Sequence, residues 1–456
     1  MSQPKIKEHQ ETVYLESLGC AKNQVDSEIM LGTLLKNGIQ LVTDPKLARY
    51  IVINTCGFLS SAVSESIERI LLLSRYKESG VCEKLIVAGC LSTRYCEGLL
   101  QEIPEIDGII GTSDYTTIIE SIRGNQPQSQ SLEWVSQKPS YSENNYKVER
   151  QRVNDAHYAY LKIAEGCSNT CSFCNIPQLR GSFHSRPIES IQTEFLQLVD
   201  SGVKEINLIS QDTSSYGIDF PGEVTLYHLV QQLLASSDAD FWLRIFYVYP
   251  NRFPAQILRL MQEDTRLVPY LDMPFQHISD KVLKKMNRKI TRQEIEAIVT
   301  TIFNQVPELS LRSSFIVGFP NEEEQDFQEL LEFVEQGIFE HIGVFTYSAE
   351  DNARSYGYGD PVPQEEKERR KTLLLEAQQK VLYQKNRERV GKKVRVLIDG
   401  LSEETDLLLQ GRTACQGVEV DGKVLVNEGK ANQGDFHLVE ITEAHPYDLV
   451  GKIVSE

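Results

Sequence analysis

The chain of 456 residues has no long hydrophobic run. No apolar stretch approaches the roughly 18 residues that are needed to span a bilayer. Residues 1–9 also lack the apolar core of a signal peptide. We therefore expect a cytoplasmic protein with no membrane partner.

Positive charge is scarce, because 47 Lys and Arg stand against 65 Asp and Glu, for a formal net charge of −18. This balance argues against a partner that is mainly nucleic-acid backbone, since phosphate binding needs an excess of positive charge. A basic protein partner fits better. The length of the chain calls for two or three domains rather than one core.

The chain has nine cysteines, an odd number. In a cytosolic protein such cysteines are expected to bind metal rather than to form a framework of disulfides. Three of them form a C-x3-C-x2-C pattern after a strand-like run: Cys167, Cys171 and Cys174, the "loop triplet". A closed zinc site takes four ligands, so three thiolates better suit a cubane iron–sulfur cluster with one iron open to a ligand from outside the protein. A three-cysteine zinc site and unligated thiols are the alternatives.

Residues 11 to about 120 alternate between strand-like and helical patterns, which predicts a parallel sheet with crossover helices. Strands are expected at 13–18, 50–54 and 84–88, with a helix over 60–79. A cysteine follows each strand: Cys20, Cys56 and Cys90, the "strand-end triplet". Because the carboxyl ends of parallel strands share one edge of the sheet, we expect these cysteines to converge and hold a second cluster. Coincidental placement is the alternative.

The rest of the chain divides into a linker, a second βα series and a small barrel. Residues 124–154 are rich in Gln, Ser, Asn and Pro, which predicts a linker. Six strands are then expected, at 159–163, 205–210, 242–247, 270–273, 310–317 and 341–345. Six βα units cannot close an eight-fold barrel, so we expect an open, partial barrel with its functional loops at the strand C-termini. Short strands after residue 391 predict a small β-barrel, with Asp421-Gly422 as a hairpin-type turn.

These features together resemble the radical S-adenosylmethionine (SAM) methylthiotransferases over nearly the whole chain. The motifs that carry the resemblance lie at 18–23, 209–213, 244–250, 272–280 and 314–320. The chain is most similar to the members that modify an aspartate of a ribosomal protein. It lacks the Gly-Cys-Gln-Met-Asn and Pro-Val-Gln-Ser-Gly sequences that are usual in the tRNA-modifying members. One departure is Ala21, where proline is more usual and would stiffen the loop after Cys20.

The resemblance implies an α/β multidomain fold. Its parts are an N-terminal methylthiotransferase domain with a parallel sheet and an auxiliary cluster (11–123), the linker (124–154), a radical-SAM domain with a partial (β/α)6 barrel (155–390) and a C-terminal TRAM β-barrel (391–456). The implied cofactors are two [4Fe-4S] clusters and SAM, with the loop triplet holding the cluster that binds SAM and cleaves it to a 5′-deoxyadenosyl radical. No amino-acid acid or base can break an unactivated C–H bond, so the cofactor radical carries that step.

The implied reaction is methylthiolation of the β-carbon of an aspartate in the small-subunit ribosomal protein twelve, with SAM as both radical source and methyl donor. An electron donor such as flavodoxin or ferredoxin is implied, and the sulfur donor stays open. Two other functions also stay open. One is a tRNA methylthiotransferase that acts on a modified adenosine, and the other is a non-catalytic iron–sulfur protein, which would release no 5′-deoxyadenosine from SAM.

Contacts to SAM are expected from polar residues at strand ends and one aromatic side chain: Phe173, Gln211, Asp212, Gln276 and Arg312. Each of these has a structural role or a substrate contact as its alternative. No catalytic side chain is assigned. The remaining cysteines and two histidines are expected to be structural: Cys82, Cys96, Cys415, His277 and His341.

The charge of the terminal barrel favours a protein substrate. Residues 391–456 hold seven Lys or Arg against twelve Asp or Glu. A surface of this sign attracts a basic protein and repels phosphate. We therefore expect the barrel to recognise the ribosomal protein rather than RNA.

Overall fold

The computed structural model describes residues 11–124, 135–136, 138–141, 145, 150–153 and 157–454. They form two compact units. Unit 1 contains the described residues up to 153 together with Glu165–Asn169 and Asn175–Ser190, and unit 2 contains the rest. Among the described residues, no helix has the length and apolar composition that a membrane crossing requires.

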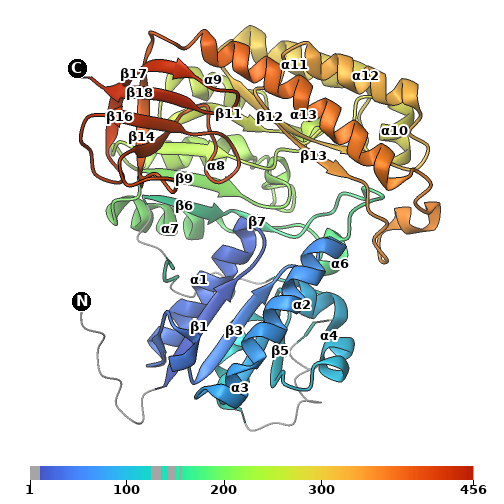
Figure 1. The fold of residues 1–456 in the computed structure, drawn as a ribbon, viewed down its shortest axis with the longest axis vertical. Coiled ribbons are helices and arrows are strands. Elements are labelled where there is room, and N and C mark those ends of the chain that lie inside the picture. Colours follow the sequence, from blue (N-terminus) through green and yellow to red (C-terminus); the bar gives the residue numbers. More distant parts are fainter. Residues whose placement is uncertain are drawn as a thin grey trace. The chain divides into compact units, whose positions relative to one another are not determined.

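Unit 1 is built on a five-stranded parallel sheet in the order β2-β1-β3-β4-β5 (Figure 1). The strands are β1 (Thr12–Ser17), β2 (Gln40–Leu41), β3 (Tyr50–Thr55), β4 (Lys84–Gly89) and β5 (Gly108–Ile110). Every residue of the central strand β3 is buried, as its continuous run Tyr-Ile-Val-Ile requires of a strand covered on both faces. The expected parallel sheet is confirmed.

The helical elements that connect or follow the strands of this sheet are α1 (Ala21–Lys36), η1 (Pro45–Leu47), α2 (Ser60–Ser74), α3 (Tyr76–Ser79), α4 (Cys90–Glu102), η2 (Tyr115–Thr117) and α5 (Ile118–Arg123). Helix α6 (Ile176–Arg180), from a later segment of unit 1, contacts α4. A two-stranded sheet pairs β7 (Ala164–Glu165) with β8 (His184–Ser185). The core packs Ile70 of α2 and Leu91 of α4 against the sheet.

Most of the expected linker at 124–154 lies outside the described residues. Among those that are described, Val135 belongs to the core of unit 1. The hydroxyl of Tyr141 donates a hydrogen bond to the carbonyl of Thr112 at 3.0 Å, and both residues are buried. At these points the chain is packed against unit 1.

Unit 2 contains a six-stranded parallel sheet in the order β13-β12-β11-β10-β9-β6. The strands are β6 (Tyr158–Lys162), β9 (Glu205–Ile209), β10 (Trp242–Ile245), β11 (Leu267–Asp272), β12 (Ser310–Val317) and β13 (His341–Thr346). Neighbours in the sheet are also neighbours along the chain, so each crossover advances by one strand and the sheet stays open. This confirms six βα units in an open arrangement.

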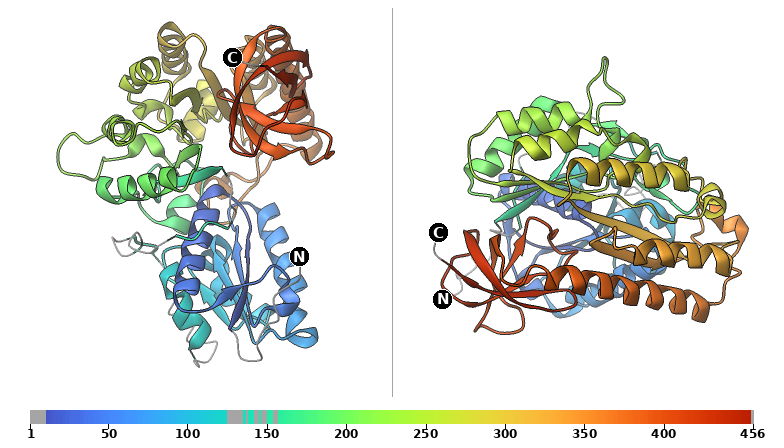
Figure 2. Two further views of the ribbon diagram at one scale, coloured as in Figure 1. Left: turned by 90° about the vertical axis from the view of Figure 1, so that its left-hand side faces the viewer. Right: turned by 90° about the horizontal axis from the view of Figure 1, so that it is seen from above.

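The crossovers of unit 2 are helical. Its helices are α7 (Ile188–Asp200), η5 (Thr213–Ser215), α8 (Leu226–Ala235), η6 (Pro250–Arg252), α9 (Gln256–Glu263), α10 (Asp280–Lys285), α11 (Arg292–Gln305), α12 (Glu324–Glu335), η7 (Arg354–Tyr358) and α13 (Gln364–Arg387). Helices α12 and α13 lie side by side (Figure 1). The long helix α13 then leads into the terminal barrel (Figure 2).

The terminal strands close into a five-stranded barrel in the order β14-β15-β16-β18-β17. They are β14 (Lys393–Leu401), β15 (Leu409–Thr413), β16 (Val424–Glu428), β17 (Phe436–Ala444) and β18 (Leu449–Ile453). The predicted hairpin connection is present, because β15 and β16 are antiparallel neighbours, but the prediction that Asp421-Gly422 forms its tight turn is wrong. Residues 414–423 form a long connection, in which the Asp421 carboxylate accepts hydrogen bonds from the Gly417 N–H and the Tyr270 hydroxyl, each at 2.7 Å. The Asp-Gly pair therefore serves tertiary contacts rather than a tight turn.

A buried ion cluster joins the barrel to the sheet within unit 2. The carboxylate of Glu205 on β9 accepts hydrogen bonds from Arg244 on β10 at 2.8 Å and from Arg412 on β15 at 2.5 Å. Arg412 also pairs with Asp399 at 2.9 Å. Burial alone would raise the pKa of Glu205, but Arg412 and Arg244 outweigh it and hold the pKa below its usual value.

Candidate functional site

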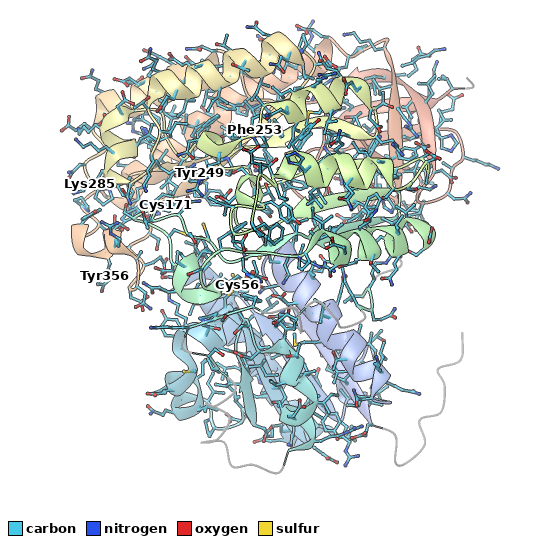
Figure 3. The ribbon with its side chains drawn as sticks, turned by 180° about the vertical axis from the view of Figure 1, so that it is seen from behind. Cys56, Cys171, Tyr249, Phe253, Lys285 and Tyr356 are labelled. Atoms are coloured by element: carbon cyan, nitrogen blue, oxygen red, sulfur yellow. The ribbon has the colours of Figure 1, made fainter. Side chains whose placement is uncertain are left out.

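The strand-end triplet lies at the carboxyl edge of the unit 1 sheet, as its position in the sequence predicts. Cys20 caps the N-terminus of α1 after β1, Cys56 directly follows β3, and Cys90 begins α4 after β4. Figure 3 marks the position of Cys56 in unit 1. Exposure falls from Cys20, which is exposed, through Cys56 to Cys90, which is buried.

Two glycines allow the three cysteine loops to approach one another closely. Gly19 has a φ of +91°, and a Cβ built on it would lie 2.8 Å from the Cβ of Cys56. A Cβ on Gly57 would lie 2.8 Å from the carbonyl carbon of Cys90. No side chain fits at either position, so glycine is required where these loops meet.

The thiols of the strand-end triplet influence one another electrostatically. Burial raises the pKa of the Cys90 thiol to about 12, Arg180 acts in the opposite direction, and Cys20 and Cys56 add to the increase. Burial also raises the pKa of Cys56, and the neighbouring Cys20 raises it further. Three mutually close thiols are soft ligands, which suit an iron–sulfur cluster better than a hard cation.

In the described part of the chain, no three His, Cys, Asp or Glu side chains stand close enough together to share one metal ion. A cubane cluster does not require this, because each of its thiolate ligands binds a different iron. The strand-end triplet therefore fits a cluster.

The loop triplet follows the first strand of unit 2, and each of its members is held by backbone hydrogen bonds. The N–H of Cys167 donates to the carbonyl of Gly181 at 3.1 Å. The N–H of Cys174 donates to the carbonyl of Cys171 at 3.3 Å, which closes a turn around the last two cysteines. Cys167 is buried, and the other two are partly exposed.

Cys171 lies against a cation and an aromatic ring in unit 2. Arg288 donates a hydrogen bond to the Cys171 sulfur at 3.6 Å, and its guanidinium lies 4.0 Å from the centre of the Tyr249 ring. Cys171 and Tyr249 lie close together in Figure 3. Burial raises the pKa of Tyr249 to about 12, with Arg288 opposing and Cys171 adding to this shift. Neither residue was assigned a role from the sequence: Tyr249 lies within the motif at 244–250 but was not singled out there, and Arg288 lies in none of the motifs.

The residues expected to contact SAM take different positions in unit 2. Phe173 packs against an apolar cluster that includes Met286 and Phe319. Gln211 and Asp212 follow β9 after one intervening residue. The two carboxylate oxygens of Asp212 accept hydrogen bonds from the hydroxyls of Ser214 (2.6 Å) and Ser215 (2.7 Å).

Gln276 and Arg312 are held by neighbouring strands. Gln276 has a φ of +75°, and its N–H donates to the Ser314 carbonyl on β12 at 2.8 Å. Arg312 lies near the beginning of β12 and pairs with Asp272 (3.4 Å) and Asp421 (3.3 Å). All five SAM contacts stay predictions.

The two histidines singled out in the sequence contact the backbone. The Nδ1 of His277 accepts a hydrogen bond from the Ser279 N–H at 3.0 Å, and His341 lies with Nε2 3.1 Å from the Cys415 carbonyl. Burial raises the pKa of Cys415 to about 12, which keeps its thiol protonated at neutral pH.

Comparison with known proteins defines the class to which this fold and these sites belong. Residues 161–334 match the Radical SAM superfamily, residues 12–111 match Uncharacterized protein family UPF0004, and residues 390–454 match the TRAM domain. The fold is similar to that of the radical S-adenosylmethionine methyltransferase TsrM from Kitasatospora setae, with a TM-score of 0.53 and 13% identity over 74% of this chain and 72% of that one. The protein is a radical SAM enzyme, a class that uses a [4Fe-4S] cluster and SAM.

The closer relatives are named ribosomal protein uS12 methylthiotransferase RimO. The protein of Geobacter sulfurreducens is 43% identical over 98% of this chain and 99% of its own length. Those of Geotalea uraniireducens and Myxococcus xanthus are also 43% identical, over 97% of this chain and over 98% and 92% of their own lengths. The chain belongs to the RimO family of radical-SAM methylthiotransferases, which confirms the resemblance drawn from its motifs.

Proposed function

We propose that this enzyme methylthiolates the β-carbon of an aspartate in ribosomal protein uS12, with SAM as both radical source and methyl donor. The observation that carries this proposal is the 43% identity, over nearly the whole length of both chains, to relatives named for action on uS12. All three matched regions of the chain agree with a radical SAM enzyme that carries additional domains.

We propose that the loop triplet holds the [4Fe-4S] cluster that binds SAM and that the strand-end triplet holds a second one. When bound, these groups supply the radical chemistry that amino-acid side chains cannot. The protein's own part is to position them. The Arg288 guanidinium donates to the Cys171 sulfur, and Gly19 and Gly57 allow the strand-end loops to converge. The candidates for orienting SAM are Phe173, Gln211, Asp212, Gln276 and Arg312.

We propose that the barrel attracts the basic substrate through a particular turn. Several of its acids already have partners within unit 2: Asp399 pairs with Arg412, and Asp421 pairs with Arg312. Exposed acids remain in the turn between β14 and β15, at Glu403, Glu404 and Asp406. The adjacent Leu407 is 89% exposed, so this turn offers an apolar contact beside its negative charge.

We propose the same four parts of the chain that the sequence indicates. They are the N-terminal domain with the auxiliary cluster (11–123), the linker (124–154), the domain that binds SAM (155–390) and the terminal barrel (391–456). A flavodoxin or ferredoxin would supply electrons, and the sulfur donor stays open. A ribosomal-protein substrate would place the reaction in the cytoplasm.

Mass spectrometry of cells that lack this gene tests the proposed substrate. Ribosomal protein uS12 should lose the mass of its methylthio group, while the methylthio nucleosides of bulk tRNA stay unchanged. Loss of a tRNA modification with uS12 unaffected would instead support the tRNA-modifying alternative. Purified reconstituted enzyme should also release 5′-deoxyadenosine from SAM in the presence of a reductant, whereas a non-catalytic iron–sulfur protein would release none.

A further inference from the structure

Arg180 is a buried cation that the sequence motifs did not single out. It ends α6, in the segment Asn175–Ser190 of unit 1, and is only 1% exposed. Its guanidinium donates to the Glu165 carboxylate at 3.0 Å and to the Asn23 side-chain oxygen at 2.5 Å, and it pairs with Asp26 at 3.0 Å. Burial opposes the charge of Arg180, but Glu165 and Asp26 outweigh it and hold its pKa well above the ordinary value.

Asn23 links Arg180 to all three loops of the strand-end triplet. Its side-chain N–H groups donate to the carbonyls of Leu18 (2.9 Å) and Thr55 (3.0 Å), which lie just before Cys20 and Cys56 in the chain. Its oxygen, which accepts from Arg180, also lies 4.0 Å from the Cys90 sulfur. A shift of Arg180 would therefore disturb the backbone of two cysteine loops and the surroundings of the third cysteine.

Arg180 also lies close to the sulfurs, because the Asn23 oxygen that accepts its hydrogen bond at 2.5 Å lies 4.0 Å from the Cys90 sulfur. Burying a guanidinium with two carboxylates costs several kcal/mol of desolvation per ion, and well-packed apolar side chains often stabilise a core as well or better. Such a cluster beside three thiols therefore points to a role in the site.

We propose that Arg180 is a positioning residue of the strand-end triplet, which fixes the cysteine loops through Asn23 and places a positive charge beside the cluster sulfurs. This inference rests on the proposed function, in which that triplet holds a [4Fe-4S] cluster. The reduction potential of such a cluster depends on nearby charge and on hydrogen bonds to its sulfurs. A positive charge favours the more negative, reduced form, so Arg180 raises the potential and the carboxylates of Glu165 and Asp26 lower it.

The test uses the full-length chain in which the loop triplet is replaced by Ala, so that all bound iron belongs to the strand-end triplet. Iron content, the electron paramagnetic resonance spectrum and the midpoint potential are measured after anaerobic reconstitution. Arg180→Met should shift the potential to more negative values, and Glu165→Gln should shift it to more positive values. Arg180→Lys keeps the charge and should restore most of the potential, although it loses the forked hydrogen bonds.

Arg150→Met is the matched control. Arg150 forms another buried ion pair in unit 1, with Glu28 on α1, and its side chain is 6% exposed. Its loss should affect folding without shifting the potential. Opposite shifts for Arg180→Met and Glu165→Gln would support the inference, because a purely structural defect has no such dependence on the sign of the charge.

The role of Arg180 would be refuted if Arg180→Met and Glu165→Gln shifted the potential in the same direction, or if no Arg180 or Glu165 variant changed it. Neither result would refute the second cluster itself. If Arg180→Met does not fold, the other two variants decide the question: the inference stands if Glu165→Gln shifts the potential to more positive values while Arg180→Lys stays close to the parent, and it is refuted if Glu165→Gln gives no positive shift. If the parent protein with an intact Arg180 binds no cluster, then the proposed second cluster itself is refuted. The two failures are therefore distinguishable.

Discussion

Replacing Glu205 with Gln would leave two buried guanidinium groups without the carboxylate that they share. Arg244 and Glu205 are both 0% exposed, and Arg412 is 4% exposed. Because Arg412 comes from the barrel and the other two from the sheet, this cluster is a buried polar link between the two parts of unit 2. Its loss should loosen the barrel.

The size of the effect follows from the partners that remain. Removing one partner of a buried ion pair costs about 3–5 kcal/mol. After the substitution, Arg412 still pairs with Asp399 at 2.9 Å, and Arg244 still donates to the Ala414 carbonyl at 2.8 Å. We therefore expect the lower end, about 3 kcal/mol, which is roughly a hundredfold increase in the equilibrium constant for local opening.

Hydrogen exchange measured by mass spectrometry can detect this opening in peptides from β14 and β17. Exchange there should be roughly a hundredfold faster in Glu205→Gln than in the parent protein. Asp240→Asn is the matched control, since Asp240 pairs with Arg395 of the barrel but the two side chains are 59% and 42% exposed. An exposed pair contributes at most about 1 kcal/mol, so exchange should rise less than about sixfold.

A combined replacement checks the electrostatic cause. Changing Glu205, Arg244 and Arg412 together to Met removes all three charges and should restore much of the protection, because apolar side chains of similar size often replace buried ion clusters without loss. The reasoning is wrong if Glu205→Gln exchanges no faster than Asp240→Asn, or if the triple replacement is no better than the single one.

Four further predictions concern acid stability, cofactors and substrate. The pKa of Glu205 in the folded protein lies below its unfolded value of about 4.3, so the ionised carboxylate stabilises the fold above that pH, and this stabilisation is lost as the pH falls through the folded pKa. Hydrogen exchange in β14 should therefore rise below about pH 4, and the Glu205→Gln variant should show no such rise. Reconstituted enzyme should bind about eight irons, and replacing the loop triplet with Ala should leave about half, so a variant that keeps all its iron would contradict the assignment. Cys171→Ala should abolish SAM cleavage, whereas folded Cys56→Ala should retain cleavage without sulfur insertion, and equal loss in both would argue against separate roles. Neutralising the three acids at 403, 404 and 406 in the full-length enzyme should weaken binding to uS12 and reduce its salt dependence, while tighter, salt-sensitive binding of the parent enzyme to tRNA would refute a protein substrate.

The sequence alone determined most of the strands and placed the cysteines at their ends. The strand expected at 310–317 is β12 with the same bounds, because a long β-rich run shows its period directly. Cys20, Cys56 and Cys90 could be assigned to one edge because strand direction in a βα series is fixed by its crossovers. The spacing of the loop triplet is likewise a local property of the chain.

Only the tertiary structure decided which charged residues surround these cysteines. Nothing near Arg180 or Arg288 in the sequence shows that one is buried beside Asn23 and the other contacts the Cys171 sulfur. Short elements such as β5 and β18 were also missed, since three to five residues carry too little pattern of their own. The sequence around a single Arg or Asp looks the same whether that residue is solvated or buried in an ion cluster. Asp421 shows in addition that long-range partners can override a local turn signal, since it binds Tyr270 and Arg312. Packing between distant segments decides these roles, because each buried charge must find its partner there.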